Sequence, residues 1–220
     1  MFQKFVKWGV IVNIFLFFSA LALAQAPDNV PNLKLPITSS QFKKYYKQSD
    51  GYTILSDEYS KLTQPLNKQE IDFPIKNGDY RFDLLFDRFT QDIRYYVVGG
   101  FVQDNYLYKV IIYNGNPSGR TDTEVANVQI NSYDEQGKLI DALLLDSGYD
   151  YKYDSNIKFS VNEDLTINIK MSVPYCVEYP DAESHKNAPK WLEYKEDIYQ
   201  INQGQFKLVS SKKERVYLSQ

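Results

Sequence analysis

Hydrophobic and polar residues alternate along most of the chain beyond Tyr80, with the period of two that is typical of half-buried β-strands. The clearest case is the segment 165–173, where every second residue is large and apolar and the residues between are Thr, Asn, Lys and Ser. Turn-forming residues separate such segments. The pattern predicts strands at 80–87, 93–102, 106–113, 125–133, 138–145, 157–161, 165–173, 196–201 and 205–209, and a closing strand at 215–218.

The loops between these segments are short, for example Asp134–Gly137 and Asn162–Asp164. Short loops join only antiparallel neighbours, because a parallel pair needs a long crossover. We therefore predict a mainly β protein, an antiparallel meander with one face on the core and one toward water. Nine or so strands would curl into a barrel or split into a two-sheet sandwich. Gly99 and Gly100, inside one predicted strand, indicate a bulge or sharp bend.

Residues 25–79 have a different pattern and form an N-terminal lead-in, which we assign to one domain with the β region 80–220. Thr38 to Gln41 has the sequence of a capping box, and the apolar spacing after it predicts a short helix near 39–48. A second short helix is predicted from Ser56, ended by Pro65. These helices would plug an end or cover an edge of the sheet.

The first 24 residues have the three-part layout of a secretory signal peptide. Lys4 and Lys7 precede an apolar stretch over 9–23, and Ala22 and Ala24 are the small residues that a signal peptidase recognises. Cleavage after Ala24 predicts a periplasmic or secreted protein with no stable membrane span. The alternative is an uncleaved anchor, for which the 17 residues from 8 to 24 are the lower limit.

Composition narrows the possible functions further. The 220-residue chain has a net charge of −3, which becomes −5 without residues 1–24, and this acidity argues against nucleic-acid binding. A single cysteine, Cys176, excludes an internal disulfide, and with one histidine it makes a zinc site unfavourable, so no metal and no cofactor are predicted. In an oxidising compartment Cys176 is either buried or pairs between chains, and burial is the preferred interpretation.

Neither candidate for catalysis has a specific pattern. His185 lies in the polar stretch 178–190 beside Ser184, but the chain has no Gly-x-Ser-x-Gly motif, so a solvated loop histidine is favoured over a triad. Paired carboxylates could hydrolyse glycans. The acidic residues that cluster along the chain are Asp141, Asp146, Asp150 and Asp154. In a chain with 28 acidic residues such clusters arise by chance, so solvated strand faces and turns are the favoured interpretation.

The residues 149–154 give the strongest binding signal. In an extended segment Tyr149, Tyr151 and Tyr153 point to one side, and Asp150 and Asp154 point to the other. Such a tyrosine row can bind a protein or stack on sugar rings, although a tyrosine-lined core strand explains it equally well. The candidate binding surface comprises these residues and His185.

We therefore expect an exported, non-catalytic binding protein, such as an inhibitor or immunity-type factor for an envelope-acting enzyme. Its acidity would steer it onto a basic protein partner in the cell envelope. The alternatives are a carboxylate-dependent glycan hydrolase and a glycan or small-molecule binding module. The sequence leaves open the identity of the partner or ligand, the oligomeric state and the closure of the sheet.

Overall fold

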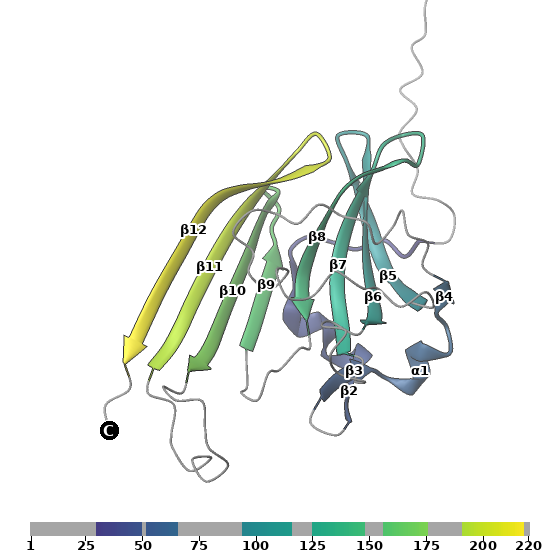
Figure 1. Cartoon of the computed structure of the whole chain (residues 1–220). Coiled ribbons are helices and arrows are strands. Elements are labelled where there is room, and N and C mark those ends of the chain that lie inside the picture. Colours follow the sequence, from purple (N-terminus) through teal and green to yellow (C-terminus); the bar gives the residue numbers. More distant parts are fainter. Residues whose placement is uncertain are drawn as a thin grey trace, which may run out of the picture.

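The computed structural model describes residues 30–49, 52–65, 94–115, 125–147, 156–175 and 191–217. Apart from a seven-residue 3₁₀-helix and a single α-helical turn, its elements are strands (Figure 1). In chain order they are β1 (Ile37–Thr38), η1 (Ser39–Tyr45), β2 (Tyr46–Ser49), β3 (Tyr52–Leu55), α1 (Asp57–Ser60), β4 (Gln64–Pro65), β5 (Arg94–Gln103), β6 (Tyr106–Gly115), β7 (Val125–Tyr133), β8 (Leu139–Ser147), β9 (Asn156–Val161), β10 (Thr166–Tyr175), β11 (Trp191–Asn202) and β12 (Gln205–Tyr217).

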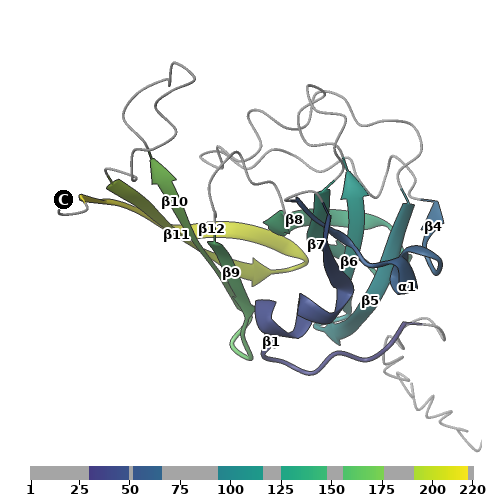
Figure 2. The same cartoon turned by 90° about the horizontal axis from the view of Figure 1, so that it is seen from below.

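The strands form two five-stranded antiparallel sheets and a small hairpin, β2–β3. Sheet A has the order β4-β5-β6-β7-β8, and sheet B has the order β1-β9-β10-β11-β12. Among the described strands no ladder joins the two sheets, so the predicted meander splits into two layers and does not close into a barrel. The sheets lie together at one end and diverge toward the far ends of β10, β11 and β12 (Figures 1 and 2).

Tight turns set the register of the long hairpins. Asp104 and Asn105, which join β5 to β6, have φ angles of 50° and 66°. Gln203 and Gly204, which join β11 to β12, have φ angles of 49° and 74°. Two consecutive positive φ angles define the two-residue turn whose twist matches that of the flanking strands. The predicted loops at these positions are therefore confirmed.

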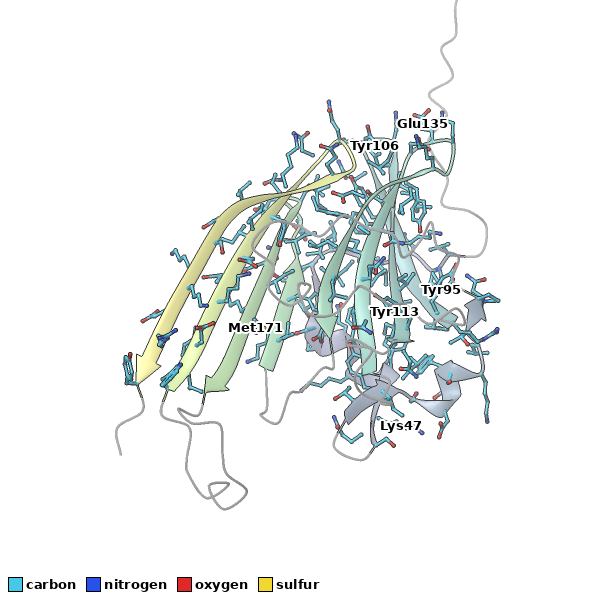
Figure 3. All side chains as sticks on the ribbon, in the orientation of Figure 1. Lys47, Tyr95, Tyr106, Tyr113, Glu135 and Met171 are labelled. Atoms are coloured by element: carbon cyan, nitrogen blue, oxygen red, sulfur yellow. The ribbon has the colours of Figure 1, made fainter. Side chains whose placement is uncertain are left out.

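The hydrophobic core lies between the facing sides of the two sheets. One contiguous cluster joins residues of sheet A, such as Val110 and Ile130, to residues of sheet B, such as Ile167 and Tyr199. Phe42 of η1 belongs to the same cluster and packs its ring 5.3 Å from that of Phe159. Figure 3 shows the side chains that fill the space between the sheets where these lie close together.

The predicted irregularity at Gly99 and Gly100 is confirmed, since the register of β5 against β6 shifts between Val97 and Gly99. The reason is a close backbone approach. The N–H of Gly100 donates to the carbonyl of Pro31, and the N–H of Leu33 donates to the carbonyl of Gly100, both at 2.8 Å. A Cβ atom at Gly100 would lie 2.5 Å from the carbonyl oxygen of Tyr108, so no side chain fits there.

The two predicted helices are shorter than the sequence indicated. The first is the 3₁₀ turn η1, which ends at Tyr45, because the chain then becomes strand β2. The N–H of Thr38 donates to Oε1 of Gln41 at 3.1 Å, which is one of the two bonds of the predicted capping box. The second helix is the single turn α1, which ends at Ser60 rather than at Pro65, and Pro65 belongs to strand β4.

Four strand predictions need correction or lie outside the described residues. Strand β11 begins at Trp191, five residues before the start predicted for the strand at 196–201. Strand β12 runs without interruption over thirteen residues, where two separate strands were expected. Leu165 belongs to a turn with a φ of 63°, so β10 begins one residue later than predicted. The predicted strand at 80–87 lies outside the described residues.

Strand β7 departs from the expected half-buried pattern, because both of its faces are buried. Val128 and Ile130 face the core between the sheets, while Gln129 and Asn131 lie on the opposite face with no exposed area. These polar side chains are satisfied by one another. Tyr113 donates to Gln129 at 3.0 Å, Gln129 donates to Asn131 at 2.5 Å, and Asn131 donates to Tyr133 at 3.0 Å. Burial raises the pKa of the Tyr113 hydroxyl in this network.

Candidate functional site: a cationic row on the outer face of sheet B

The outer face of sheet B, which points away from the core, carries mostly polar and charged side chains. Alternation along β9 and β10 places Phe159 and Ile169 inward, and therefore places Lys158 and Lys170 outward. The turn between these strands fixes their register, because the N–H of Asn162 donates to the carbonyl of Thr166 at 2.9 Å. Lys158 is thereby paired directly with Lys170.

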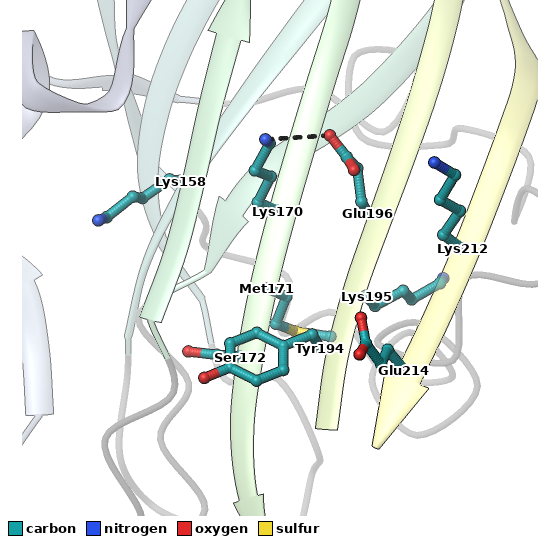
Figure 4. A pocket seen from close by; sticks show the side chains of 9 residues that line it. All are labelled: Lys158, Lys170, Met171, Ser172, Tyr194, Lys195, Glu196, Lys212 and Glu214. Atoms are coloured by element: carbon teal, nitrogen blue, oxygen red, sulfur yellow. Dashed lines mark ion pairs between the residues drawn. The ribbon is translucent and has the colours of Figure 1, made fainter. Parts of the chain in front are cut away.

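The same lateral row continues across β11 and β12. Lys170 is opposite Glu196, and Glu196 is opposite Lys212, so the row reads Lys158, Lys170, Glu196, Lys212 (Figure 4). Adjacent strands are about 4.8 Å apart, so four strands spread this row over about 14 Å. We call these four residues the cationic row. It has three positive charges and one negative charge.

Glu196 sits between two of the lysines and balances only part of their charge. Its carboxylate lies 3.1 Å from Nζ of Lys170 and accepts a hydrogen bond of 3.2 Å from Nδ2 of Asn168. The hydrogen bonds from Lys170 and Asn168, and then the charges of Lys170 and Lys212, hold the pKa of Glu196 below its usual value. Neither Lys158 nor Lys212 forms an ion pair with a residue in the part of the chain that the structure describes.

A shallow pocket of about 400 Å³ includes this row. The pocket also includes the neighbouring row of residues, toward the C-terminal ends of β10 and β12. This row contains Ser172, Tyr194 and Glu214, which are paired across β10, β11 and β12. Tyr194 is 42% exposed and offers an aromatic face beside the lysines. Ammonium groups beside an amphipathic aromatic ring suit a partner that has carboxylates and some apolar surface.

The inner face of the same strands carries a second, buried group of charges. Nζ of Lys195 lies 2.8 Å from the carboxylate of Asp197, and these side chains are only 8% and 4% exposed. Ser211 donates to the other oxygen of Asp197 at 2.7 Å. Glu193, two residues before Lys195 on the same face of β11, lies 2.7 Å from Nζ of Lys213. These pairs neutralise one another inside the fold, and we assign them a structural role.

One member of the predicted carboxylate cluster, Asp141, has a structural role. Asp141 is buried on β8, and its two oxygens accept backbone hydrogen bonds of 2.8 Å from Ala142 and Phe206. Asp146 is half-buried and its charge contributes to raising the pKa of Tyr46, after the larger effect of burial. The other two members of that cluster, Asp150 and Asp154, are outside the described residues.

The structure leaves the whole predicted binding surface undescribed. Its members Tyr149, Asp150, Tyr151, Tyr153, Asp154 and His185 lie outside the described residues, as does Cys176. The cationic row was not predicted, although Lys170 was placed on a polar strand face. The turn over 162–165 would have indicated the pairing of Lys158 with Lys170, because turn geometry sets hairpin register. The pairing of Glu196 with Lys212 could not be predicted in the same way, because Lys212 lies between the two strands that the sequence pattern predicts in place of β12.

Among the described residues, no group of three His, Cys, Asp or Glu side chains is arranged to hold a metal ion. No helix in the described part of the chain has the length and hydropathy needed to cross a membrane. Comparisons of the chain with protein-family models, with curated proteins and with solved structures found no match.

Proposed function

We propose that the protein is an exported, non-catalytic binding protein, of the inhibitor or immunity type, that acts on a protein in the cell envelope. Its contact surface is the outer face of sheet B, and the partner contributes an acidic patch. The cationic row carries this proposal, because it concentrates positive charge on a protein whose net charge is −3. Local charge of the opposite sign to the whole molecule selects and orients a partner.

The positive charge of this surface changes the charge that is expected of the partner. The net charge alone favours a basic target, whereas Lys158, Lys170 and Lys212 favour an acidic one. The backbone positions of the row are fixed relative to one another, because its members stand on four hydrogen-bonded strands and not on loops. A preorganised surface loses less entropy when it binds than a flexible one. Asp141, by contrast, is buried and each of its oxygens accepts a backbone hydrogen bond, which favours a structural role over acid–base chemistry on a glycan.

The test is affinity capture from an envelope extract with the purified chain as bait, at low and at high salt. A triple variant, Lys158→Gln with Lys170→Gln and Lys212→Gln, removes the positive charges of the row. A matched control carries Lys43→Gln, Lys61→Gln and Lys138→Gln, three exposed lysines outside the row. We expect the wild type and the control to retain one protein with an acidic surface at low salt, and the triple variant to lose it.

Retention of that protein by the triple variant, or capture of a polysaccharide in place of a protein, would contradict the proposed surface. The export proposal is tested separately by N-terminal sequencing of the mature protein, where Gln25 is the expected first residue. An intact N-terminus on a protein fractionated with the cytosol would contradict it.

A further inference from the structure

The edges of the two sheets differ in length and cover. Strands β1 and β4, at one edge of each sheet, have only two residues each. Strand β8, the other edge of sheet A, contacts β9 and β12. Strand β12, the other edge of sheet B, has thirteen residues, and no described strand pairs with its outer side. Such an edge presents a row of unpaired backbone N–H and C=O groups, which can template another strand.

The exposed side chains of β12 include the charged residues 212–215, which protect an edge in part, and apolar residues, which do not. Ser211 to Tyr217 are all exposed, and they include Val216 and Tyr217, the latter at 71%. Val209, the extra residue at a β-bulge opposite Ile198 and Tyr199, is 60% exposed. Beyond the bulge the ladder is regular from Ser210 onward. A long, regular and partly apolar edge is the arrangement on which strand addition occurs.

We propose that two copies of this chain associate through their β12 strands, antiparallel and with the two-fold axis at Lys213. In this register Lys212 of each copy is opposite Glu214 of the other, and the regular segment from Ser210 to Val216 pairs with itself. The exposed apolar residues Val209 and Tyr217 meet at both ends. Neither Lys212 nor Glu214 has an ion-pair partner among the described residues, so both charges are available for the second copy.

The pattern of charges selects this register over its neighbours. Directly opposite residues of an antiparallel pair share a face, so only registers that pair residues on the same face of the sheet are allowed. An axis at Lys212 sets Lys212 against itself, and an axis at Glu214 sets Lys213 against Arg215 twice. An axis at Ser211 leaves only the three residues from Ser210 to Lys212 to pair regularly before the bulge at Val209. Like charges directly opposite each other are destabilising, whereas the axis at Lys213 gives two opposite-charge pairs.

The one like-charge contact in the chosen register, Lys213 with its copy, is partly compensated within each chain. Nζ of Lys213 lies 2.7 Å from Oε1 of Glu193, and the guanidinium of Arg215 lies 3.6 Å from Oε2 of the same residue. Glu193 is buried and stays in place on β11. Each Lys213 therefore reaches the axis as part of an ion pair and not as an isolated charge.

The assembly would be one continuous ten-stranded sheet, with the cationic rows of both copies on the same face. This inference goes beyond the proposed function and does not depend on it, because the edge pairs through the backbone groups of β12. Lys212 is the one member of the cationic row that also lies at this edge. Capture of a partner tests the proposed contact surface on the outer face of sheet B. The oligomeric state of the purified chain tests the proposed pairing of β12 strands.

Charge reversal on the edge tests the dimer and its register together. The molar mass of the purified chain, measured by light scattering after size exclusion over a range of concentrations, should correspond to a dimer. K212E sets two acidic residues opposite each other, and E214K does the same with two lysines, so each variant should be a monomer. The double variant K212E/E214K restores both opposite-charge pairs and should be a dimer again. K158E, on the same face but far from the edge, should remain a dimer.

Two further results are specific to the axis at Lys213. A mixture of K212E with E214K should form a mixed dimer, because each acidic residue then faces a lysine. Lys213→Cys should form a disulfide between copies under mild oxidation, since self-paired residues lie within disulfide distance, and Glu214→Cys should not. A wild-type chain that is monomeric at every concentration, or a dimer that K212E leaves intact, would overturn the inference. Circular dichroism of each variant confirms that its sheets are formed.

Discussion

The side chain of Asp141 on β8 accepts a hydrogen bond of 2.8 Å from the backbone N–H of Phe206 on β12. This bond joins the edge of sheet A to the first residues of the last strand of sheet B. Ser132 on β7 supports the same junction, because its hydroxyl donates to the carbonyls of Asp141 and of Gly204. The two sheets are therefore connected by polar bonds at the end where they lie close together, in addition to the apolar core.

We predict that Asp141→Ala destabilises the fold strongly. The change leaves the buried N–H groups of Phe206 and Ala142 without their acceptor, and a hydrogen bond to a charged group contributes about 1.5–3 kcal/mol. The free energy of unfolding should fall by about 3 kcal/mol in urea titrations. Asp57→Ala is the control, because this exposed carboxylate pairs with Lys47 only at the surface. An Asp141→Ala variant as stable as the Asp57→Ala variant would show that the junction does not stabilise the fold.

This junction also shows where the sequence stops predicting the structure. The strands can be predicted from local alternation, because a strand with one buried face needs an apolar residue at every second position. The hairpins can be predicted from turns such as Asp104–Asn105. The bond between Asp141 and Phe206 spans 65 residues and has no local pattern. The same holds for Gln129 and Asn131, whose alternation with Val128 and Ile130 predicts a water-facing side that is in fact buried. In β12, the residues 210–214 lack apolar alternation because both faces of the strand are solvated there. The sequence pattern therefore predicts two strands where the structure has one.

We predict that Gly100→Ala is destabilising because of contact and not because of backbone conformation. An added Cβ would lie 2.5 Å from the carbonyl oxygen of Tyr108 and 3.2 Å from Cγ1 of Val30. Overpacking of this kind costs about 1–3 kcal/mol, and backbone atoms cannot move aside as a side chain does. Thermal unfolding should occur at a clearly lower temperature than in the wild type.

Gly137→Ala is the comparison for this effect. Gly137 has a φ of 74°, but nothing lies within 4 Å of an added Cβ. The substitution therefore carries only the penalty of left-handed backbone, about 1 kcal/mol. A larger loss of stability in Gly137→Ala than in Gly100→Ala would contradict the close contact of Gly100 with the carbonyl of Tyr108 on β6.

The fold should lose stability in alkaline solution through its buried tyrosines. Burial raises the pKa of Tyr108 to about 12, above its usual value of 10.0. In the unfolded chain the hydroxyl ionises near pH 10, so ionisation favours unfolding above that pH. The contribution of Tyr108 to stability is therefore complete below pH 10 and is lost as the pH rises from about 10 to about 12. Burial also raises the pKa of Tyr113, which adds a loss of the same sign.

Thermal unfolding followed by circular dichroism at a series of pH values measures this loss. Tyr108→Phe has no hydroxyl to ionise at that site, so its unfolding temperature should decline less steeply between pH 10 and 12 than that of the wild type. An identical decline in Tyr108→Phe and the wild type would assign the alkaline loss to other groups.

The buried pair of Lys195 and Asp197 should behave as a structural unit. Lys195→Met removes the cation and leaves the carboxylate of Asp197, which is 4% exposed, with Ser211 as its described donor. An uncompensated buried charge destabilises a fold by about 3–5 kcal/mol, and we expect a loss of that order in urea titrations. Lys195→Met with Asp197→Leu removes both charges and should recover most of the loss, because an apolar pair of similar size avoids the desolvation of two ions. Lys170→Met, which breaks the exposed pair with Glu196, should lose far less than Lys195→Met. If the double variant were no more stable than Lys195→Met, these charges would be needed for something other than neutralising each other, and the inner face of sheet B would become a second candidate site.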